Sequence, residues 1–224
     1  MTDMGFIEPL LISLKVAAAA TAVSLILGVA GAFMVARFDF PGKRIIEAVL
    51  TLPLVLPPTV LGYYLLVTAG KNGAFGRWLA DGLGVSLVFT WQGAAVAAAV
   101  VSMPLILKSA RAAFEGVPEG LEQAARTLGK TGTGVFFLVT LPLARRGILA
   151  GAALAFARAM GEFGAALMVA GDMPGRTQTL SMAIFDAVQS GNDRLGLMLV
   201  LAASVVCVVL LVGSERLLKA PAGG

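Results

Sequence analysis

The stretch Pro118-Glu-Gly-Leu-Glu-Gln-Ala-Ala-Arg-Thr-Leu-Gly129 decides the fold of this chain. Pro118 suits the first position of a helix, and Gly129 can adopt the left-handed conformation that ends one. Glu119 and Glu122 favour the positive end of the helix dipole. The apolar residues of the stretch share one face of such a helix: Leu121, Ala124, Ala125 and Leu128. We therefore expect a short amphipathic helix at about 118–129, whose apolar face either binds a partner or packs on the ends of neighbouring helices.

This helix lies within the longest polar segment of the chain, residues 108–147, and the segments around it are strongly apolar. Of the 224 residues, 58% are hydrophobic and 13% are charged, and the mean hydropathy is +0.90. In a soluble domain about a quarter of the residues are charged. Crossing the hydrocarbon core of a bilayer takes about 20 apolar residues. Five runs are long enough to do so: 9–36, 45–69, 87–107, 148–171 and 195–214.

These runs predict an all-α membrane protein, a bundle of five transmembrane helices that forms one domain over residues 1–224. Two further segments, 75–83 and 178–188, are expected as short helices on the outer face. The second has apolar residues at helical spacing and would supply a sixth, re-entrant element. Small residues at helical spacing let helices approach closely in lipid. Two such stripes predict the helix contacts: Ala20, Ser24, Gly28 and Ala32 in the first run, and Gly147, Gly151 and Ala155 in the fourth.

Basic residues divide unevenly between the loops. If the N-terminus is outside, the inner loops hold eleven of the 17 Lys and Arg residues and the outer loops hold four. Inner loops of membrane proteins carry such an excess, so we expect the N-terminus outside and the C-terminus in the cytoplasm. Residues 108–147 then form a cytoplasmic loop. The inner residues are Arg37, Lys43, Arg44, Lys108, Arg111, Arg126, Lys130, Arg145, Arg146, Arg216 and Lys219, and the outer ones are Lys71, Arg77, Arg176 and Arg194.

Two features inside the runs indicate a route through the membrane. Pro53, Pro57 and Pro58 remove backbone hydrogen bonds at membrane depth, so they either face a water-lined pathway or kink a packed helix. Arg158 and Glu162 lie four residues apart in the fourth run and therefore share one helical face. A charge there costs about 2.5–3.5 kcal/mol on insertion scales. This couple either lines the pathway or forms an internal pair that fixes helix packing.

The polar segment carries a spacing that resembles a known signature. Gln123-Ala124-Ala125, three residues, Gly129, nine residues and then Val139-Thr140-Leu141-Pro142 are similar to the EAA motif of ABC import permeases, Glu-Ala-Ala-x3-Gly-x9-Ile-x-Leu-Pro. Gln123 replaces the glutamate, so a salt bridge at this position is not expected, whereas docking by shape is. The resemblance implies the type I ABC importer permease fold, in which the short helix is a coupling helix that docks in a groove of the ATPase subunit. The coupling residues it implies are Glu119, Glu122, Gln123, Ala124, Ala125, Arg126, Leu128, Gly129, Leu141 and Pro142.

The resemblance narrows to the molybdate permeases at Leu52-Pro-Leu-Val-Leu-Pro-Pro-Thr-Val-Leu-Gly-Tyr-Tyr-Leu-Leu66, and it extends over about residues 8–218. It implies import of molybdate, or of tungstate, from periplasm to cytoplasm by alternating access. It also implies a homodimer in the bacterial inner membrane, an ATPase dimer beneath it and a periplasmic oxyanion-binding protein above it. Sulfate permeases share the loop signature and the element Gly161-Glu-Phe-Gly164 but are longer, so a sulfate or thiosulfate permease is the alternative.

Other classes of protein fit the sequence less well. Residues 124–131 match a relaxed P-loop pattern, but a P-loop follows a strand, whereas a helix-forming segment precedes this match. We expect no cofactor, and no nucleic-acid partner because the basic residues sit beside apolar runs. The chain has no histidine and one cysteine, Cys207, which argues against an intramembrane enzyme. A secondary transporter is a remote alternative, since its usual internal repeats and several intramembrane acids are not evident.

Overall fold

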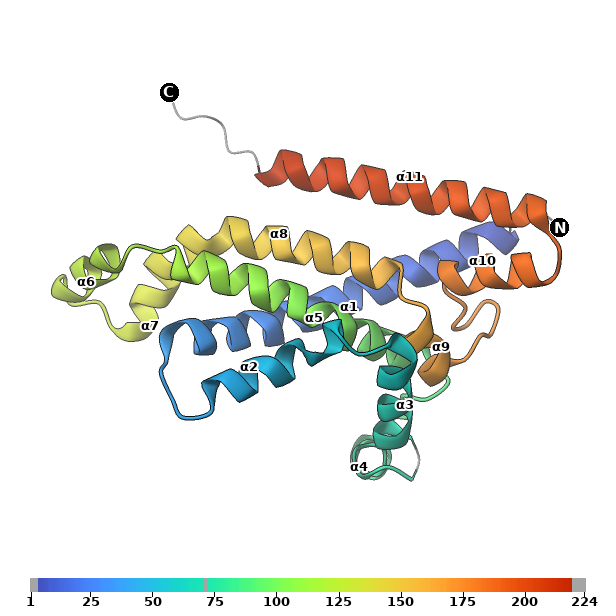
Figure 1. The fold of residues 1–224 in the computed structure, drawn as a ribbon, viewed down its shortest axis with the longest axis horizontal. Coiled ribbons are helices and arrows are strands. Elements are labelled where there is room, and N and C mark those ends of the chain that lie inside the picture. Colours follow the sequence, from blue (N-terminus) through green and yellow to red (C-terminus); the bar gives the residue numbers. More distant parts are fainter. Residues whose placement is uncertain (1–3, 71, 219–224) are drawn as a thin grey trace.

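The computed structural model describes residues 4–70 and 72–218. Lys71 and Lys219, which were counted among the basic loop residues, lie outside the described residues. The described residues form helices joined by short connections and contain no strand, which confirms the all-α prediction. Their four longest helices lie roughly along the long axis of the molecule (Figure 1). These are α1 (Met4–Arg37), α5 (Trp91–Glu115), α8 (Leu141–Met160) and α11 (Asp193–Leu218).

Shorter elements connect these helices. Figure 1 shows α6 and α7 at one end of the bundle, α10 at the other, and α3 directed away from the long axis. The expected outer helices at 75–83 and 178–188 are present as α4 and α10. The shorter elements are α2 (Lys43–Thr51), the 3₁₀ helix η1 (Leu52–Leu54), α3 (Pro58–Ala69), α4 (Ala74–Leu83), α6 (Glu119–Thr127), α7 (Gly132–Val135), the π-helix η2 (Phe136–Thr140), α9 (Gly164–Ala170) and α10 (Leu180–Gln189).

The core of the bundle forms where α1, α5 and α8 pack against one another. Ala20, Ser24 and Ala32 of α1 are fully buried, and the Ser24 hydroxyl donates a 3.1 Å hydrogen bond to the Ala99 carbonyl of α5. On α8, a Cβ added at Gly147 would lie 2.5 Å from the Cβ of Ala113 in α5. Both predicted stripes of small residues therefore lie at helix contacts, where they let the backbones approach closely.

The second predicted run is a bent pair of helices. Lys43–Leu54 and Pro58–Ala69 meet at an angle of 108°, so the run expected across residues 45–69 is broken at its prolines into two helices. Pro57 precedes α3 with an extended backbone, and proline at the next position cannot continue a helix hydrogen-bond ladder. Among the described residues, four helical segments are long and apolar enough to cross a membrane, and the bent pair makes a fifth if it counts as one crossing.

Two further boundaries differ from the prediction. The helix α5 continues to Glu115, and a helical segment resumes at Gly132, so the polar loop is much shorter than residues 108–147. The fourth run, expected at 148–171, is displaced because the helix starts before Pro142 and ends at Met160. Hydropathy fails at these points because amphipathic helices continue beyond the apolar part of their sequence, and because the helix passes through Pro142 after a π turn.

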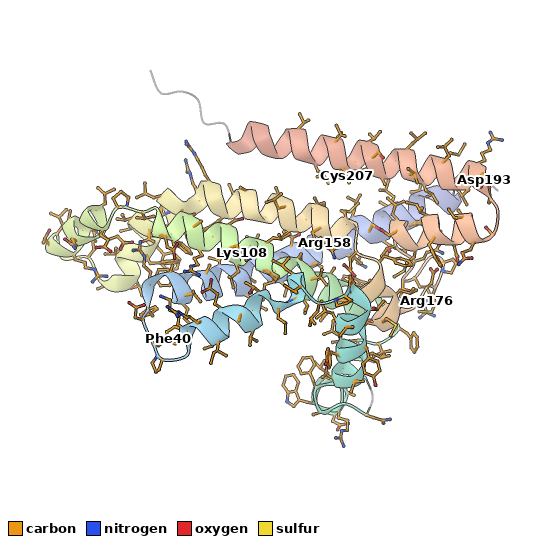
Figure 2. All side chains as sticks on the ribbon, viewed as in Figure 1. Phe40, Lys108, Arg158, Arg176, Asp193 and Cys207 are labelled. Atoms are coloured by element: carbon orange, nitrogen blue, oxygen red, sulfur yellow. The ribbon has the colours of Figure 1, made fainter. Side chains whose placement is uncertain are left out.

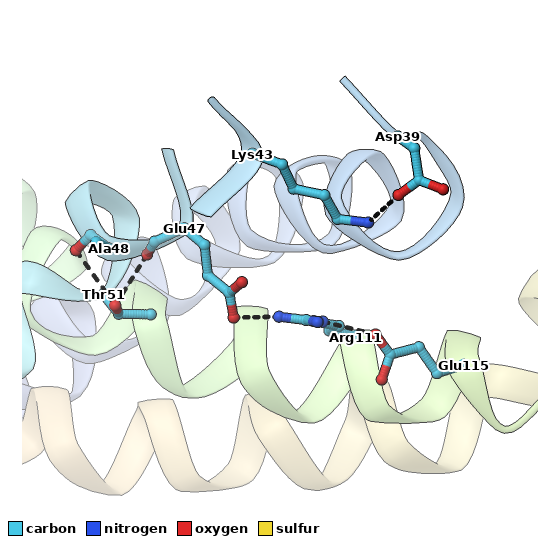
Figure 3. Close-up of polar contacts among 7 residues, drawn as sticks. All are labelled: Asp39, Lys43, Glu47, Ala48, Thr51, Arg111 and Glu115. Atoms are coloured by element: carbon cyan, nitrogen blue, oxygen red, sulfur yellow. Dashed lines mark hydrogen bonds and ion pairs between the residues drawn. The ribbon is translucent and has the colours of Figure 1, made fainter. Parts of the chain in front are cut away.

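An ion pair fixes α2 along α5 (Figure 3). Glu47 of α2 pairs with Arg111 of α5, and the Arg111 Nε lies 2.7 Å from a carboxylate oxygen of Glu115 one turn further along α5. The apolar residues Ile45 and Val49 of α2 remain exposed. The first half of the bent pair is therefore held on the bundle by charge as well as by packing, while part of its surface stays open to lipid or to a partner.

Replacing Gly151 with alanine is expected to lower the melting temperature. The added methyl group would lie 2.8 Å from the Cβ of Ser109 and 3.2 Å from the Cα of Ile106, so α5 and α8 must move apart. Overpacking of this kind costs about 1 to 3 kcal/mol. Gly213→Ala on α11 is the matched control, because a Cβ there meets nothing within 4 Å. Thermal unfolding in detergent measures both variants, and an unchanged Gly151→Ala protein would contradict the close helix contact.

Candidate functional site

The predicted amphipathic helix is α6, which lies at one end of the bundle (Figure 1). Pro118 precedes the helix with an extended backbone and does not occupy the first helical position, so the predicted start shifts by one residue. Gly129 has a φ of 81°, as predicted for the residue that ends the helix. The amide of Lys130 donates to the carbonyl of Ala125, at 3.1 Å, and this bond closes the turn.

The apolar face of α6 is open to solvent. Leu121 is 50% exposed and Leu128 is 80% exposed, and no residue of α6 is buried. These leucines therefore do not pack on the ends of neighbouring helices, which was one of the two alternatives for this face. Burial of a leucine side chain is worth about 1.5–3 kcal/mol, so the face favours association with a partner.

The opposite face of α6 is held by Glu122. The Glu122 side chain is 12% exposed, and its Oε1 lies 2.6 Å from the Nη2 of Arg37, the last residue of α1. The hydroxyl of Thr140 donates a second hydrogen bond of 2.6 Å to the same oxygen. Sequence reasoning placed Glu122 on this helix but missed both partners. Of these two partners, only Thr140 could have been suspected from the sequence, because it directly precedes the motif residues Leu141-Pro142.

The Leu141-Pro142 pair follows a change of helical geometry. The residues before it, Phe136–Thr140, form the π-helix η2, and the Leu141 amide donates to the carbonyl of Phe136. Pro142 lies within the continuous helical segment Gly132–Met160, where it has no N–H to donate to the preceding turn, and the π turn directly before it accommodates the lost hydrogen bond. Single π turns within α-helices occur frequently at functional sites. Here the π turn sets the register at which Thr140 reaches Glu122.

The structure divides the predicted residues into two groups. The coupling residues lie at the α6 end: Glu119, Glu122, Gln123, Ala124, Ala125 and Arg126 within α6, Leu128 and Gly129 in the following turn, and Leu141 and Pro142 at the start of α8. The pathway residues lie along the bundle: Pro53 in η1, Pro57 before α3, Pro58 at its first position, Arg158 in the last turn of α8 and Glu162 directly after it. In Figure 2, Arg158 lies well away from α6, between Lys108 and Arg176 along the long axis.

Arg158 and Glu162 form the expected pair. Their side chains meet at 2.9 Å, and the side chain of Glu162 is 2% exposed whereas that of Arg158 is 35% exposed. The other carboxylate oxygen of Glu162 accepts a 2.9 Å hydrogen bond from the amide of Ala165, in the first turn of α9. Glu162 therefore pairs with the guanidinium of Arg158 and accepts a hydrogen bond from a free amide at the start of α9, at the point where the helix is broken. The pair has a clear structural role here.

The break at Glu162 adjoins the bend at the prolines. A Cβ added at Gly164, the first residue of α9, would lie 3.1 Å from the Cβ of Pro58. One turn further along α3, a Cβ at Gly62 would lie 2.9 Å from the Cα of Ala165. Two interrupted helices thus meet along α3 and α9, and glycine on each side allows their close approach.

The opposite end of the bundle carries polar contacts of its own. The Lys15 ammonium of α1 lies 3.8 Å from the ring centre of Trp91. In the loop after α9, burial and then the charge of Asp186 raise the pKa of Asp172. Gln178 donates a 3.1 Å hydrogen bond to Asp186. An aspartate just beyond an apolar run gives too little information to predict this cluster, because the loop conformation creates it.

The sequence matches one family over most of its length. The family described as "Binding-protein-dependent transport system inner membrane component" matches residues 21–220. A molybdenum transport system permease protein ModB of Escherichia coli is 47% identical over 189 residues, which cover 84% of this chain and 82% of the relative. ModB of Haemophilus influenzae is 43% identical, with 93% and 91% covered. A sulfate transport system permease protein CysW of Synechococcus elongatus is 34% identical, with 99% and 77% covered.

Solved structures match the fold. A chain of the MetNI methionine ABC transporter, in an inward-facing conformation, superposes with a TM-score of 0.75 at 16% identity and covers 95% of this chain and 94% of that one. A chain of a bacterial alginate ABC transporter superposes with a TM-score of 0.76 at 14% identity, with 96% and 78% covered. At these identities the match establishes the fold and nothing finer. The type I importer permease fold expected from the sequence is confirmed.

Arg158→Ala is expected to destabilise the protein more than the double substitution Arg158→Ala with Glu162→Gln. Removing the arginine leaves a buried carboxylate without its counter-ion, and we expect this to cost roughly 2 to 3 kcal/mol of stability. The cost is smaller than for a fully buried ion pair because the Arg158 side chain is partly exposed. The glutamine of the double variant is neutral and can still accept the Ala165 hydrogen bond, so it should recover part of that loss. Melting temperatures in detergent decide the order. A double variant less stable than the single one would refute this account of the pair.

Proposed function

Because the chain belongs to the family of binding-protein-dependent transport system inner membrane components, we propose that it is the membrane-spanning permease subunit of an ATP-driven importer. It is a transport subunit and not an enzyme. The observation that carries the proposal is the exposed apolar face of α6, with Leu121 and Leu128, at one end of a bundle of apolar helices. A separate ATPase subunit covers this face and hydrolyses the ATP.

Molybdate is the substrate that we propose, with tungstate as a second oxyanion of the same charge and nearly the same size. The relatives with 47% and 43% identity are described as molybdenum permeases, whereas the sulfate permease is 34% identical. Import of sulfate or thiosulfate is therefore the alternative. Tight binding within the pathway would slow release, so selection among these anions is assigned to the periplasmic binding protein.

The assembly that we propose contains two copies of this chain, two ATPase subunits and one periplasmic binding protein. The ATPases bind the α6 end and the binding protein binds the α10 end. On α11, apolar side chains such as Leu197, Val205 and Val209 are more than half exposed, as expected of a helix that faces lipid. An excess of basic residues near α6, including Arg37 and Arg126, supports a cytoplasmic position for that end, with the N-terminus outside and the C-terminus inside.

Alternating access supplies the mechanism. ATP binding closes the ATPase dimer and draws the two α6 helices together, and the bundles then open toward the loaded binding protein. ATP hydrolysis and product release restore the inward-facing state. We assign the bend at Pro57 and Pro58 and the break at Glu162 to the pathway, because interrupted backbone within a membrane is tolerated where it is buried in protein or lines a cavity.

Reconstitution tests the proposal. The chain, its ATPase and the cognate binding protein in proteoliposomes should take up molybdate only with ATP inside, and uptake should persist when the proton gradient is collapsed. Tungstate should compete strongly and sulfate weakly. Uptake that is driven by a proton gradient in the absence of the ATPase would identify a secondary transporter instead. Preferential uptake of sulfate would support the ATP-driven importer but would show that its substrate is sulfate and not molybdate.

Leu121→Ser and Leu128→Ser are each expected to weaken the binding of the ATPase at least tenfold. Each leucine buried by a partner contributes about 1.5–3 kcal/mol, and 1.4 kcal/mol corresponds to a factor of ten in affinity. Leu197→Ser on α11 is the matched control, since Leu197 is also exposed, at 62%, but lies on the helix that we assign to lipid. Co-purification with the tagged ATPase in detergent measures the loss. Retained ATPase in both leucine variants would show that α6 is not the docking surface.

A further inference from the structure

Packing alone does not hold α6 on the bundle. No residue of α6 is buried, and a pocket of about 310 Å³ separates part of the helix from α1 and η2. Gln123 and Arg126 of α6 line this pocket on one side, and Phe33 and Phe136 line it on the other. Short connections at residues 116–118 and 128–131 join α6 to its neighbours in sequence. A displacement of α6 would be absorbed by these connections unless a side chain ties the helix to the bundle.

Glu122 provides that tie. A single oxygen of its carboxylate lies 2.6 Å from Arg37 at the end of α1 and 2.6 Å from Thr140 at the end of η2. The side chains of Arg37 and Glu122 are 18% and 12% exposed, so the contact is largely shielded from water. Hydrogen bonds to charged groups are short and roughly twice as strong as those between neutral groups. The ends of α1 and η2, which contribute residues 85 and 18 positions from Glu122, therefore meet α6 at one carboxylate.

Thr140 is oriented for this contact by the π turn. Threonine hydroxyls in helices commonly donate to a carbonyl one turn earlier, as Thr51 does to Glu47 and Thr68 does to Tyr64 in this chain. Thr140 instead donates across to Glu122 and is 2% exposed. The π turn, closed by the hydrogen bond from the Leu141 amide to the Phe136 carbonyl, gives the helix the register in which Thr140 faces Glu122.

We propose that Arg37, Glu122 and Thr140 form a clamp that makes α6 move together with α1 and α8. This inference rests on the proposed function, because the displacement it transmits is the one that the ATPase imposes on α6. The three are positioning residues and do not touch the transported anion. With the clamp intact, motion of α6 is passed to the two long helices. Without it, α6 moves on its connections and the ATPase turns over without opening the bundle.

The test is the number of molybdate ions taken up per ATP hydrolysed by the complete transporter in proteoliposomes. Glu122→Gln should lower this ratio at least tenfold while the binding-protein-stimulated ATP hydrolysis stays within about threefold of the unmodified protein. Asp81→Asn is the matched control. Asp81 is an exposed carboxylate on α4, outside the coupling residues, and its substitution should leave the ratio unchanged. A purely structural role of Glu122 would instead lower uptake and ATP hydrolysis together through loss of assembled transporter.

Two further sets of variants keep the test decisive if Glu122→Gln fails to assemble. Thr140→Val removes one hydrogen bond and keeps the shape, so it should lower the ratio, whereas Thr140→Ser should keep it. Arg37→Glu and Glu122→Arg should each uncouple transport, and the two together should recover a substantial part of the ratio. A ratio unchanged in Glu122→Gln or in Thr140→Val overturns the clamp.

Failure of the clamp and failure of the proposed function give different results. If the unmodified assembly takes up no molybdate or other oxyanion with ATP, the proposed function fails and the ratio is undefined. If the unmodified assembly transports and the clamp variants keep its ratio, the permease assignment stands and the clamp alone is wrong.

Discussion

The close contact of α1, α5 and α8 is the constraint on which the other features of this fold depend. In lipid there is no hydrophobic driving force between helices, so the helices adhere through close packing and hydrogen bonds. Alanine, glycine and serine supply both, as where Ser24 binds the carbonyl of Ala99 and Gly151 lies against Ser109. Because these contacts are close and join particular residues, they fix the position of α8 relative to α1. The polar contact at Glu122 and the break at Glu162 both rely on that placement.

The fold departs from a simple helical bundle at places where a helix is interrupted. Backbone groups freed within a membrane need partners, and this chain supplies them from side chains. Glu162 accepts the amide of Ala165 at the start of α9, and a π turn at η2 accommodates the approach to Pro142. Each interruption lies where two helical segments meet, whereas α5 stays helical from Trp91 to Glu115 although Pro104 lies inside it.

Sequence patterns predicted the helical class, the small-residue contacts, α6 with its ending at Gly129, and the pairing of Arg158 with Glu162. These succeeded because each depends on residues close together in the chain. The 108° bend between α2 and α3 was not predicted, since prolines show where a helix is interrupted and not how far it turns. Arg37 and Thr140 were missed because their contact with Glu122 joins residues 85 and 18 positions apart, and only the packing of α1 against α8 brings them together. Hydropathy also misplaced the end of α5 and the start of α8, where helices continue into polar sequence, and the end of α8, where the helix stops within an apolar run.

The helix α8 joins the Glu122 contact at one end of the bundle to the break at Glu162. It spans 20 residues, from Leu141 beside the Glu122 contact to Met160 before the break at Glu162, and a helix of that length extends about 30 Å. Under the proposed mechanism α8 moves as one body, and a tilt imposed at Thr140 reaches Glu162 at its far end. The far end adjoins α9, which lies against α3 through Gly164 and Pro58. Under the proposed mechanism, force applied to the exposed face of α6 reaches the proline bend through one helix, and the interruptions at its two ends are the places where the bundle can yield.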